Sequence, residues 1–331
     1  MPTAKHLRSM FQSASNGDTE SFKRVAEEII KEERAKQHHL LANDLERILY
    51  GKQTDVNNLK ILNHNVPLDK ERGLPLLSVM MPSRSIDDII LSDENRSLID
   101  EILLEQNRKD VLVTYGLKPV DKILFYGPPG CGKTITAEAL AYELELPLAI
   151  LRIDSIVSSY LGETSSNLRS IFDYIKNNRF VVLFDEFDAL GRERADISEH
   201  GEIKRVVNAL LQMFDGYRGD SILIAATNHE SNLDTAVWRR FEEVLSFTLP
   251  NLEQIKKLLE LKLKGVRRNL LVEIGELANR LKGLSHADIE RIIRRAIKDM
   301  ILQGKEFLED RQIESSLSRE EARKRRLQEN T

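Results

Sequence analysis

The stretch Lys122-Ile-Leu-Phe-Tyr-Gly-Pro-Pro-Gly-Cys-Gly-Lys-Thr134 decides the fold of this chain. Its first residues are mostly apolar and predict a buried strand, and its glycine-rich end leads into a helical pattern that begins at Ile135. The glycine-rich part fits the pattern Gly-x-x-x-x-Gly-Lys-Ser/Thr, in which backbone N–H groups and a helix N-terminus bind phosphate oxygens. A chain of this length matches the pattern by chance on the order of once in a hundred cases. We therefore predict a nucleoside triphosphate site at this loop.

The residues of the loop have distinct chemical uses. Glycine places no Cβ between the backbone and a phosphate oxygen. Lys133 can reach the β- and γ-phosphates, and the hydroxyl of Thr134 can ligate Mg²⁺. A cysteine at position 131 predicts that thiol modification interferes with nucleotide binding. The loop residues predicted to bind the nucleotide are Gly127, Pro128, Pro129, Gly130, Cys131, Gly132, Lys133, Thr134 and Ile135.

The composition is typical of a soluble globular chain with room for about two or three modules. The chain has 331 residues, of which 41% are hydrophobic and 31% charged, and a net charge of −4 that argues against a general nucleic-acid binder. Its single cysteine excludes an internal disulfide and fits a reducing compartment. No apolar run approaches the roughly 20 residues of a membrane span, and the N-terminus has no signal-peptide core. We therefore expect a cytoplasmic protein.

The hydrophobic pattern divides the chain into successive parts. Residues 1–52 predict a bundle of three amphipathic helices that can bind a partner or substrate, and residues 53–85 have the composition of a linker. Within that linker, residues 74–81 are apolar enough to dock onto another part of the protein. Strand-like and helix-like segments alternate over residues 86–250 and predict a parallel α/β domain with its ligand at the carboxyl ends of the strands.

The remainder of the chain shows helical patterns alone. Residues 251–314 predict a helical lid subdomain, and the highly charged tail of residues 315–331 is expected to fray. The strand candidates of the preceding α/β domain are residues 123–126, 148–151, 180–184, 222–226 and 244–247.

A second apolar strand ends in the carboxylates of Asp185 and Glu186. Together with the glycine-rich loop, this arrangement indicates a hydrolytic site. Asp185 is part of the predicted nucleotide and metal site because it can hold Mg²⁺, directly or through water, opposite Thr134. Glu186 can orient and polarise an attacking water. For Asp188 the pattern favours no more than a helix cap or a loop contact.

A third buried strand ends at Asn228, which can hydrogen-bond the γ-phosphate or the attacking water, although a turn-forming asparagine is the alternative. The segment that follows contains Leu233-Asp234 and then Arg239-Arg240-Phe241. It resembles the second region of homology of AAA ATPases, a family within the AAA+ class of P-loop NTPases. All three motifs occur in the order typical of this family, and the resemblance extends over residues 86–301.

The resemblance carries several implications. It implies the AAA+ fold, a five-stranded parallel sheet of order 5-1-4-3-2 with a C-terminal helical lid, and it implies ATP and Mg²⁺ as cofactors. It also implies that Asn228 is the sensor-1 residue and that Arg239 and Arg240 are arginine fingers. A finger acts on the nucleotide of the neighbouring subunit and is worth about 10³–10⁵ in rate. The active form would then be a homo-oligomeric ring, most simply a hexamer.

Further positions concern how such a ring could act on a substrate or on its nucleotide. Tyr160 and Leu161 resemble the aromatic pore loop with which AAA unfoldases grip a polypeptide, and a half-buried loop aromatic is the alternative. The charged residues between 192 and 200 stand in the place of a second pore loop, although a solvated loop is equally compatible with them. His286 stands where the family commonly has glycine. It either approaches the nucleotide or packs at a helix start.

Two functions are compatible with these patterns. In the first, a ring-forming ATP hydrolase remodels, unfolds or disassembles a protein substrate through the pore-loop aromatic. In the alternative, the ATPase is an ATP-gated regulator or adaptor of an effector protein, for example a peptidase, and threads nothing. The chain contains no His-Glu-x-x-His motif, which argues against a fused metalloprotease.

Overall fold

The computed structural model describes residues 6, 9, 13, 18–35, 66–69, 73–152, 161–190, 208–229, 233 and 235–328. The chain forms two compact units, Met1–Asn65 and Val66–Thr331. In the first unit, helix α2 (Thr19–Ala35) buries Ile29 and Ile30 on its apolar face, as its amphipathic pattern predicts. Most of the rest of the predicted bundle lies outside the described residues.

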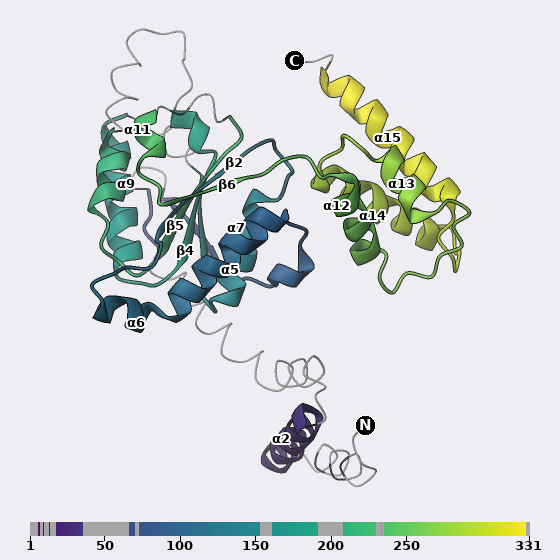
Figure 1. Cartoon of the computed structure of the whole chain (residues 1–331), viewed down its shortest axis with the longest axis horizontal. Helices are drawn as coiled ribbons and strands as arrows, with labels where there is room; N and C mark the ends of the chain where they lie inside the picture. The colour runs from purple at the N-terminus through teal and green to yellow at the C-terminus, as the bar shows by residue number, and fades with distance from the viewer. Residues whose placement is uncertain are drawn as a thin grey trace. The chain divides into compact units, whose positions relative to one another are not determined.

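The second unit is built on a six-stranded sheet of order β1-β3-β4-β5-β2-β6 (Figure 1). All neighbouring strands from β2 to β6 pair in parallel. Numbered along the chain, these five strands lie in the order 5-1-4-3-2 that the family resemblance implies. The strands are β1 (Ser78–Met80), β2 (Lys122–Tyr126), β3 (Leu148–Arg152), β4 (Val181–Asp185), β5 (Ile222–Thr227) and β6 (Glu243–Ser246).

The implied sheet of five parallel strands is confirmed, and the structure adds a sixth strand at its edge. The apolar stretch at residues 74–81 docks on the sheet as β1, which pairs antiparallel with β3 and places Val79 opposite Ala149. Val79 is buried while its two neighbours in the strand are exposed. A strand of three residues is too short for its alternation to be recognised in a sequence.

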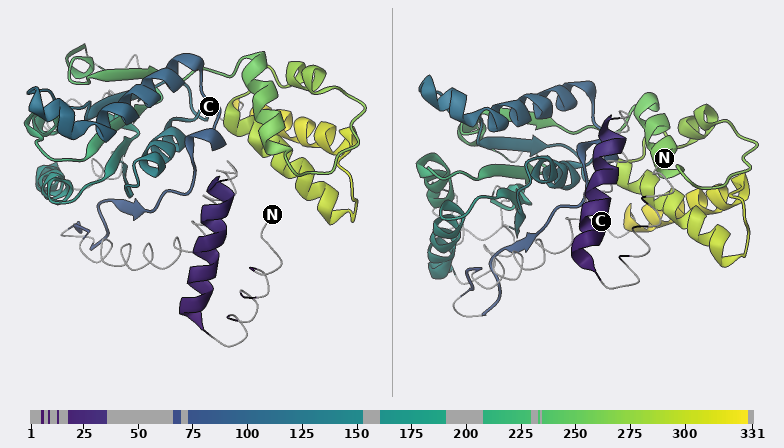
Figure 2. Two further views of the ribbon diagram at one scale, coloured as in Figure 1. Left: turned by 60° about the horizontal axis from the view of Figure 1, so that its bottom comes forward. Right: turned by 90° about the horizontal axis from the view of Figure 1, so that it is seen from below.

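The sheet is covered on both faces, as continuously apolar strands require (Figure 1, Figure 2). Val181 and Leu183 of β4 belong to the apolar core shared with α5 and α7. On the opposite face, Phe184 stacks on Phe172 of α9, with 5.9 Å between ring centroids. The helices of this domain are α5 (Asp93–Asn107), α6 (Lys109–Thr114), α7 (Lys133–Glu143), α9 (Leu161–Lys176), residues 208–216, α11 (Thr235–Trp238), and short 3₁₀ turns at Ile86–Asp88 and Phe187–Leu190.

The predicted lid is present as helices α12 (Leu252–Lys262), α13 (Ile274–Arg280), α14 (His286–Leu302) and α15 (Asp310–Gln328). They enclose a separate apolar core. The expectation that the tail frays from Ser315 is wrong, because α15 continues to Gln328. Ile313 and Ser316 are buried, and Glu320 is only 1% exposed. None of the described helices combines the length and the apolar character that a membrane crossing requires.

Candidate active site

The loop between β2 and α7 has the backbone that phosphate binding needs. Gly127, Gly130 and Gly132 have φ angles of 131°, 76° and 110°, in the region that favours glycine. A Cβ on Gly127 would lie 1.9 Å from the carbonyl oxygen of Phe247, so no other residue fits there. Helix α7 begins at Lys133 with Gly132 as its N-cap, and its first-turn N–H groups lack partners within the helix and are available to an anion.

The side chain of Lys133 folds back over this loop. It is 7% exposed, and its Nζ donates to the carbonyl oxygens of Gly127 at 2.5 Å and Pro128 at 3.1 Å. The ammonium is therefore held inside the loop. Thr134 is exposed at the start of α7, so its hydroxyl is accessible. Burial raises the pKa of the Cys131 thiol, which disfavours its reactive thiolate form. The predicted sensitivity to thiol reagents stays a prediction.

The predicted carboxylates lie where β4 ends. Asp185 is the last residue of the strand, and its Oδ1 accepts a hydrogen bond from the backbone N–H of Glu186 at 2.9 Å. Glu186 has a φ of 55°, one of two positive values among the described non-glycine residues. Such backbone strain is found preferentially at active sites, where it fixes the direction of a side chain.

The sheet register brings these residues to one edge. Tyr126 of β2 pairs with Thr227 of β5, so Gly127 and Asn228 follow neighbouring strand ends. Asp188 joins the next strand end to them: it is 1% exposed, and its Oδ1 accepts from the Thr227 hydroxyl and the Asn228 N–H, both at 3.3 Å. The sequence predicted no more than a helix cap or a loop contact for Asp188. The only available signal was a third acidic residue, three positions after Asp185.

The two candidate arginine fingers follow helix α11. Arg239 is exposed, whereas Arg240 is half-buried and its Nε donates to Asp215 Oδ2 of the same chain at 3.1 Å. The preceding residue, Trp238, packs edge-on against Tyr126 with 5.2 Å between ring centroids. This contact anchors the arginine segment to the strand that leads into the phosphate loop. Asp234 lies outside the described residues.

The structure does not describe most of the candidate pore residues. Tyr160 and residues 192–200 lie outside the described residues, and Leu161 is the first residue of α9. Their predicted roles stay predictions.

The start of helix α14 contacts the phosphate loop directly. The N–H of Ala287 donates to the carbonyl oxygen of Gly130 at 3.0 Å. A Cβ on Gly130 would lie 2.8 Å from Ser285 Oγ, so the lid as well as the backbone angle requires glycine there. Ser285 caps α14 in a capping box with Asp288. This contact between lid and loop was not predicted from the sequence.

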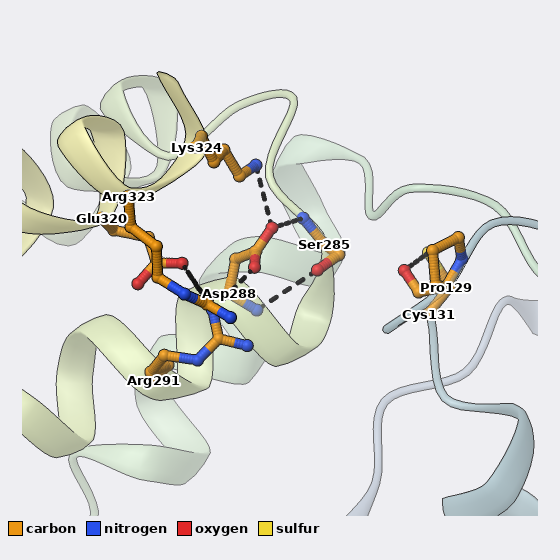
Figure 3. A network of polar contacts seen from close by, with 8 residues as sticks. All are labelled: Pro129, Cys131, Ser285, Asp288, Arg291, Glu320, Arg323 and Lys324. Atoms are coloured by element: carbon orange, nitrogen blue, oxygen red, sulfur yellow. Dashed lines mark hydrogen bonds and ion pairs between the residues drawn. The ribbon is translucent and has the colours of Figure 1, made fainter. Parts of the chain in front are cut away.

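Charged residues of α14 and α15 hold Asp288 in turn (Figure 3). Lys324 Nζ lies 2.9 Å from Asp288 Oδ2, and Arg291 Nη1 donates to Asp288 Oδ1 at 3.0 Å. Burial raises the pKa of Asp288, but hydrogen bonds from Lys324 and Ser285 outweigh it and lower the pKa below its ordinary value. Arg291 also binds the buried Glu320, as does Arg323.

The residues at this edge fit a nucleotide with Mg²⁺. Left-handed glycines, a helix N-terminus and a buried lysine suit the phosphates. The structure shows no group of three or more His, Cys, Asp or Glu residues in its described part that could hold a metal by themselves. A nucleotide-bound Mg²⁺ needs fewer, since it uses one or two protein ligands together with phosphate oxygens and waters. Thr134 and Asp185 are the candidates.

The fold and the loop define an α/β nucleotide-binding protein of the P-loop class. The model of the ATPase family associated with various cellular activities (AAA) matches residues 123–249. An uncharacterized AAA family ATPase of Sinorhizobium fredii is 41% identical over 313 residues, which are 94% of each chain. This chain therefore belongs to the AAA ATPase family, and it is a nucleotide-binding ATP hydrolase.

Archaeal relatives match over shorter parts. A putative 26S proteasome regulatory subunit homolog of Methanocaldococcus jannaschii is 34% identical over 201 residues, 60% of this chain and 54% of the relative. A cell division cycle protein 48 homolog of Archaeoglobus fulgidus is 32% identical over 251 residues, 73% of this chain and 34% of the relative. A proteasome-activating nucleotidase of Pyrococcus furiosus is 32% identical over 231 residues, which are 66% of this chain and 57% of the relative. The chain thus spans between about a third and somewhat more than half of these archaeal relatives.

Proposed function

We propose that this ATPase forms a hexameric ring in the cytoplasm and uses ATP hydrolysis to remodel, unfold or disassemble a protein substrate. The observation that carries the proposal is the pair of arginines after α11. Arg240 is engaged by Asp215 of its own chain, while the neighbouring guanidinium of Arg239 is exposed on an anchored segment. An arginine that acts on the nucleotide of a neighbouring subunit must be exposed on its own chain, as Arg239 is.

Within one site, we assign a separate role to each of the predicted residues. Lys133 and the loop N–H groups hold the β- and γ-phosphates, and Thr134 and Asp185 bind Mg²⁺. The metal supplies positive charge against the charge that develops on the transferred phosphoryl group. Glu186, fixed by its strained backbone, orients and polarises the attacking water. Asn228, whose backbone is held by Asp188, hydrogen-bonds the γ-phosphate or that water.

The neighbouring subunit completes the site. Arg239, with Arg240 beside it, brings a guanidinium to the γ-phosphate of the next subunit and stabilises transition-state charge. ATP hydrolysis in one subunit is then coupled to the position of α11 in the other. The Trp238–Tyr126 contact supports this coupling, because it joins the finger segment to the strand before its own phosphate loop.

Substrate engagement is assigned to Tyr160 and Leu161. A flat aromatic ring can hold an extended polypeptide through apolar and backbone contacts without reading its sequence. The alternative, an ATP-gated regulator of an effector such as a peptidase, is favoured by the separate N-terminal unit and by the names of two archaeal relatives, a proteasome regulatory subunit homolog and a proteasome-activating nucleotidase.

Replacing Tyr160 by Ala tests the remodelling function. We expect basal ATP turnover near that of the unaltered protein and loss of ATP-dependent unfolding of a bound partner. Tyr115, which is 79% exposed on the α/β domain, gives the matched control, and Tyr115→Ala should retain both activities. A Tyr160→Ala protein that unfolds its partner at the normal rate would leave the gated-regulator function as the better account.

A further inference from the structure

The feature that the proposed mechanism does not use is the imidazole of His286, the first residue of α14. Both Nδ1 and Nε2 are buried, and neither has a hydrogen-bond partner in the described part of the chain. Burial lowers the pKa of this histidine, so its ring is neutral near pH 7. A neutral imidazole offers one N–H donor and one acceptor, and buried groups of this kind are normally paired.

The pocket lined by His286 adjoins the phosphate loop. Its walls include Gly132, the N-cap of α7, and Ile135 in the first turn of that helix. The residue after His286, Ala287, donates to the carbonyl oxygen of Gly130. Apolar side chains on other walls, among them Leu91 and Leu258, give the pocket the mixed lining of a small-molecule site. The nucleoside of a nucleotide whose phosphates lie on the loop extends toward a space that adjoins the loop, and this pocket, with a volume of about 40 Å³, is one such space.

The other polar side chains that line this pocket are already engaged. Lys262 and Glu290 pair with each other, with 3.4 Å between Nζ and Oε1. The hydroxyl of Thr136 donates to the carbonyl oxygen of Gly132 at 2.9 Å. Asp88 accepts from the N–H of Ser85 at 3.0 Å, and Arg84 lies 3.8 Å from Glu138. His286 is thus the side chain in this lining whose hydrogen-bonding capacity is left for a ligand.

We propose that His286 recognises the nucleobase of the bound nucleotide. The two ring nitrogens of imidazole point in diverging directions, so one of them can hydrogen-bond a single polar atom at the edge of the base, such as the exocyclic amine or a ring nitrogen of adenine. The hydrogen bond to the base satisfies a ring nitrogen that the protein leaves unpaired. Because the neutral ring can donate or accept according to its tautomer, His286 strengthens the binding of nucleotides relative to bare phosphates. This inference depends on nucleotide binding and not on ring assembly or on protein remodelling.

Nucleotide titrations of His286→Ala test the assignment. The full chain carries Glu186→Gln to prevent turnover, and ADP, GDP and inorganic triphosphate are titrated by calorimetry. We expect ADP and GDP affinities to fall about tenfold, with no change for inorganic triphosphate, which reaches only the loop. Lys282→Ala, in the exposed segment before α14, is the matched control and should leave all three affinities unchanged.

A conservative variant and a spectroscopic measurement guard against a fold defect. His286→Gln keeps a donor and an acceptor and should recover much of the ADP affinity. In the unaltered protein, the ¹⁵N resonances of the His286 ring should move with ADP and stay in place with inorganic triphosphate. The assignment is overturned if His286→Ala binds ADP equally or more tightly, if inorganic triphosphate loses as much affinity as ADP, or if the ring resonances do not shift with ADP.

Discussion

The two elements that meet at the phosphate loop, the edge of the sheet and the start of α14, are held in place by different interactions. The sheet edge rests on strands buried on both faces, and its loop is shaped by glycine backbone and a lysine that donates to carbonyl oxygens. The start of α14 is held, in addition to the apolar core of the lid, by ion pairs that its Asp288 and Arg291 make with Lys324 and Glu320 of α15 (Figure 3). Burial of apolar surface does not itself depend on pH, whereas ion pairs depend on pH and are screened by salt. The site therefore combines a fixed side with a side whose position can be tuned.

The largest expected effect lies on the fixed side. Glu186→Gln should lower ATP turnover by about 10²–10⁴-fold while leaving ATP affinity intact, because it removes only the group that polarises water. Phosphate release and ATP titration measure the two quantities. Glu145→Gln is a close control, since Glu145 has the same φ of 55° but is exposed between α7 and β3. Normal turnover in Glu186→Gln would remove the proposed role of this carboxylate.

The second-largest effect, on ATP binding, is expected where the start of α14 contacts the phosphate loop. Gly130→Ala adds a Cβ that would lie 2.8 Å from Ser285 Oγ, so the start of α14 must move away from the loop. We expect ATP affinity to fall about tenfold, equivalent to about 1.4 kcal/mol. Gly116→Ala is the matched control because Gly116 has nearly the same φ, 74°, with no atom within 4 Å of the added Cβ. Equal ATP affinities in the two variants would show that the lid contact contributes nothing to binding.

The smallest effect lies on the tunable side. Lys324→Ala removes one partner of Asp288 and should lower the free energy of unfolding by about 0.5–1 kcal/mol, since this pair is partly exposed. Lys298→Ala, an exposed lysine on α14, is the control. Denaturant unfolding at two salt concentrations measures the change, and the difference between the variants should shrink in high salt. If the loss of unfolding free energy does not depend on salt, Lys324 contributes through packing and not through its charge.

The pH dependence of this pair has a definite sign. The pKa of Asp288 is lower in the folded protein, so its carboxylate stabilises the fold above the unfolded pKa, and this contribution is lost as the pH falls through the folded value. Lys324→Ala should therefore lose less stability than the unaltered protein on acidification below about pH 4. Parallel acid-unfolding curves for the two proteins would contradict this.

The same contrast explains how much the sequence could predict. The loop, the five parallel strands and the residues at their ends were found because local pattern determines them: an apolar strand followed by Gly132-Lys133 or by Asp185-Glu186. Contacts between residues that are far apart in the sequence have no such local pattern. β1 is a strand only because β3 lies beside it, and α15 looks like a charged tail until Lys324 meets Asp288, 36 positions earlier.

Asp188 shows the same limit within the site. Its carboxylate accepts hydrogen bonds from Thr227 and Asn228, about 40 positions away, and a single buried carboxylate after a strand has no sequence signal of its own. The arginine segment could be located by its resemblance, but the engagement of Arg240 by Asp215 could not. Residue roles that depend on one contact between distant elements need the structure.

The central claim is that two neighbouring copies of this chain build each working site, one through its phosphate loop and the other through its arginines. Mixing Lys133→Ala subunits with Arg239→Ala/Arg240→Ala subunits tests it most directly, because each variant alone should be nearly inactive. We predict that the mixture regains a measurable fraction of ATP turnover, since some junctions then contain an intact loop facing an intact arginine pair. A mixture no more active than the sum of its parts, or a monomer that hydrolyses ATP at the full rate, would contradict the claim.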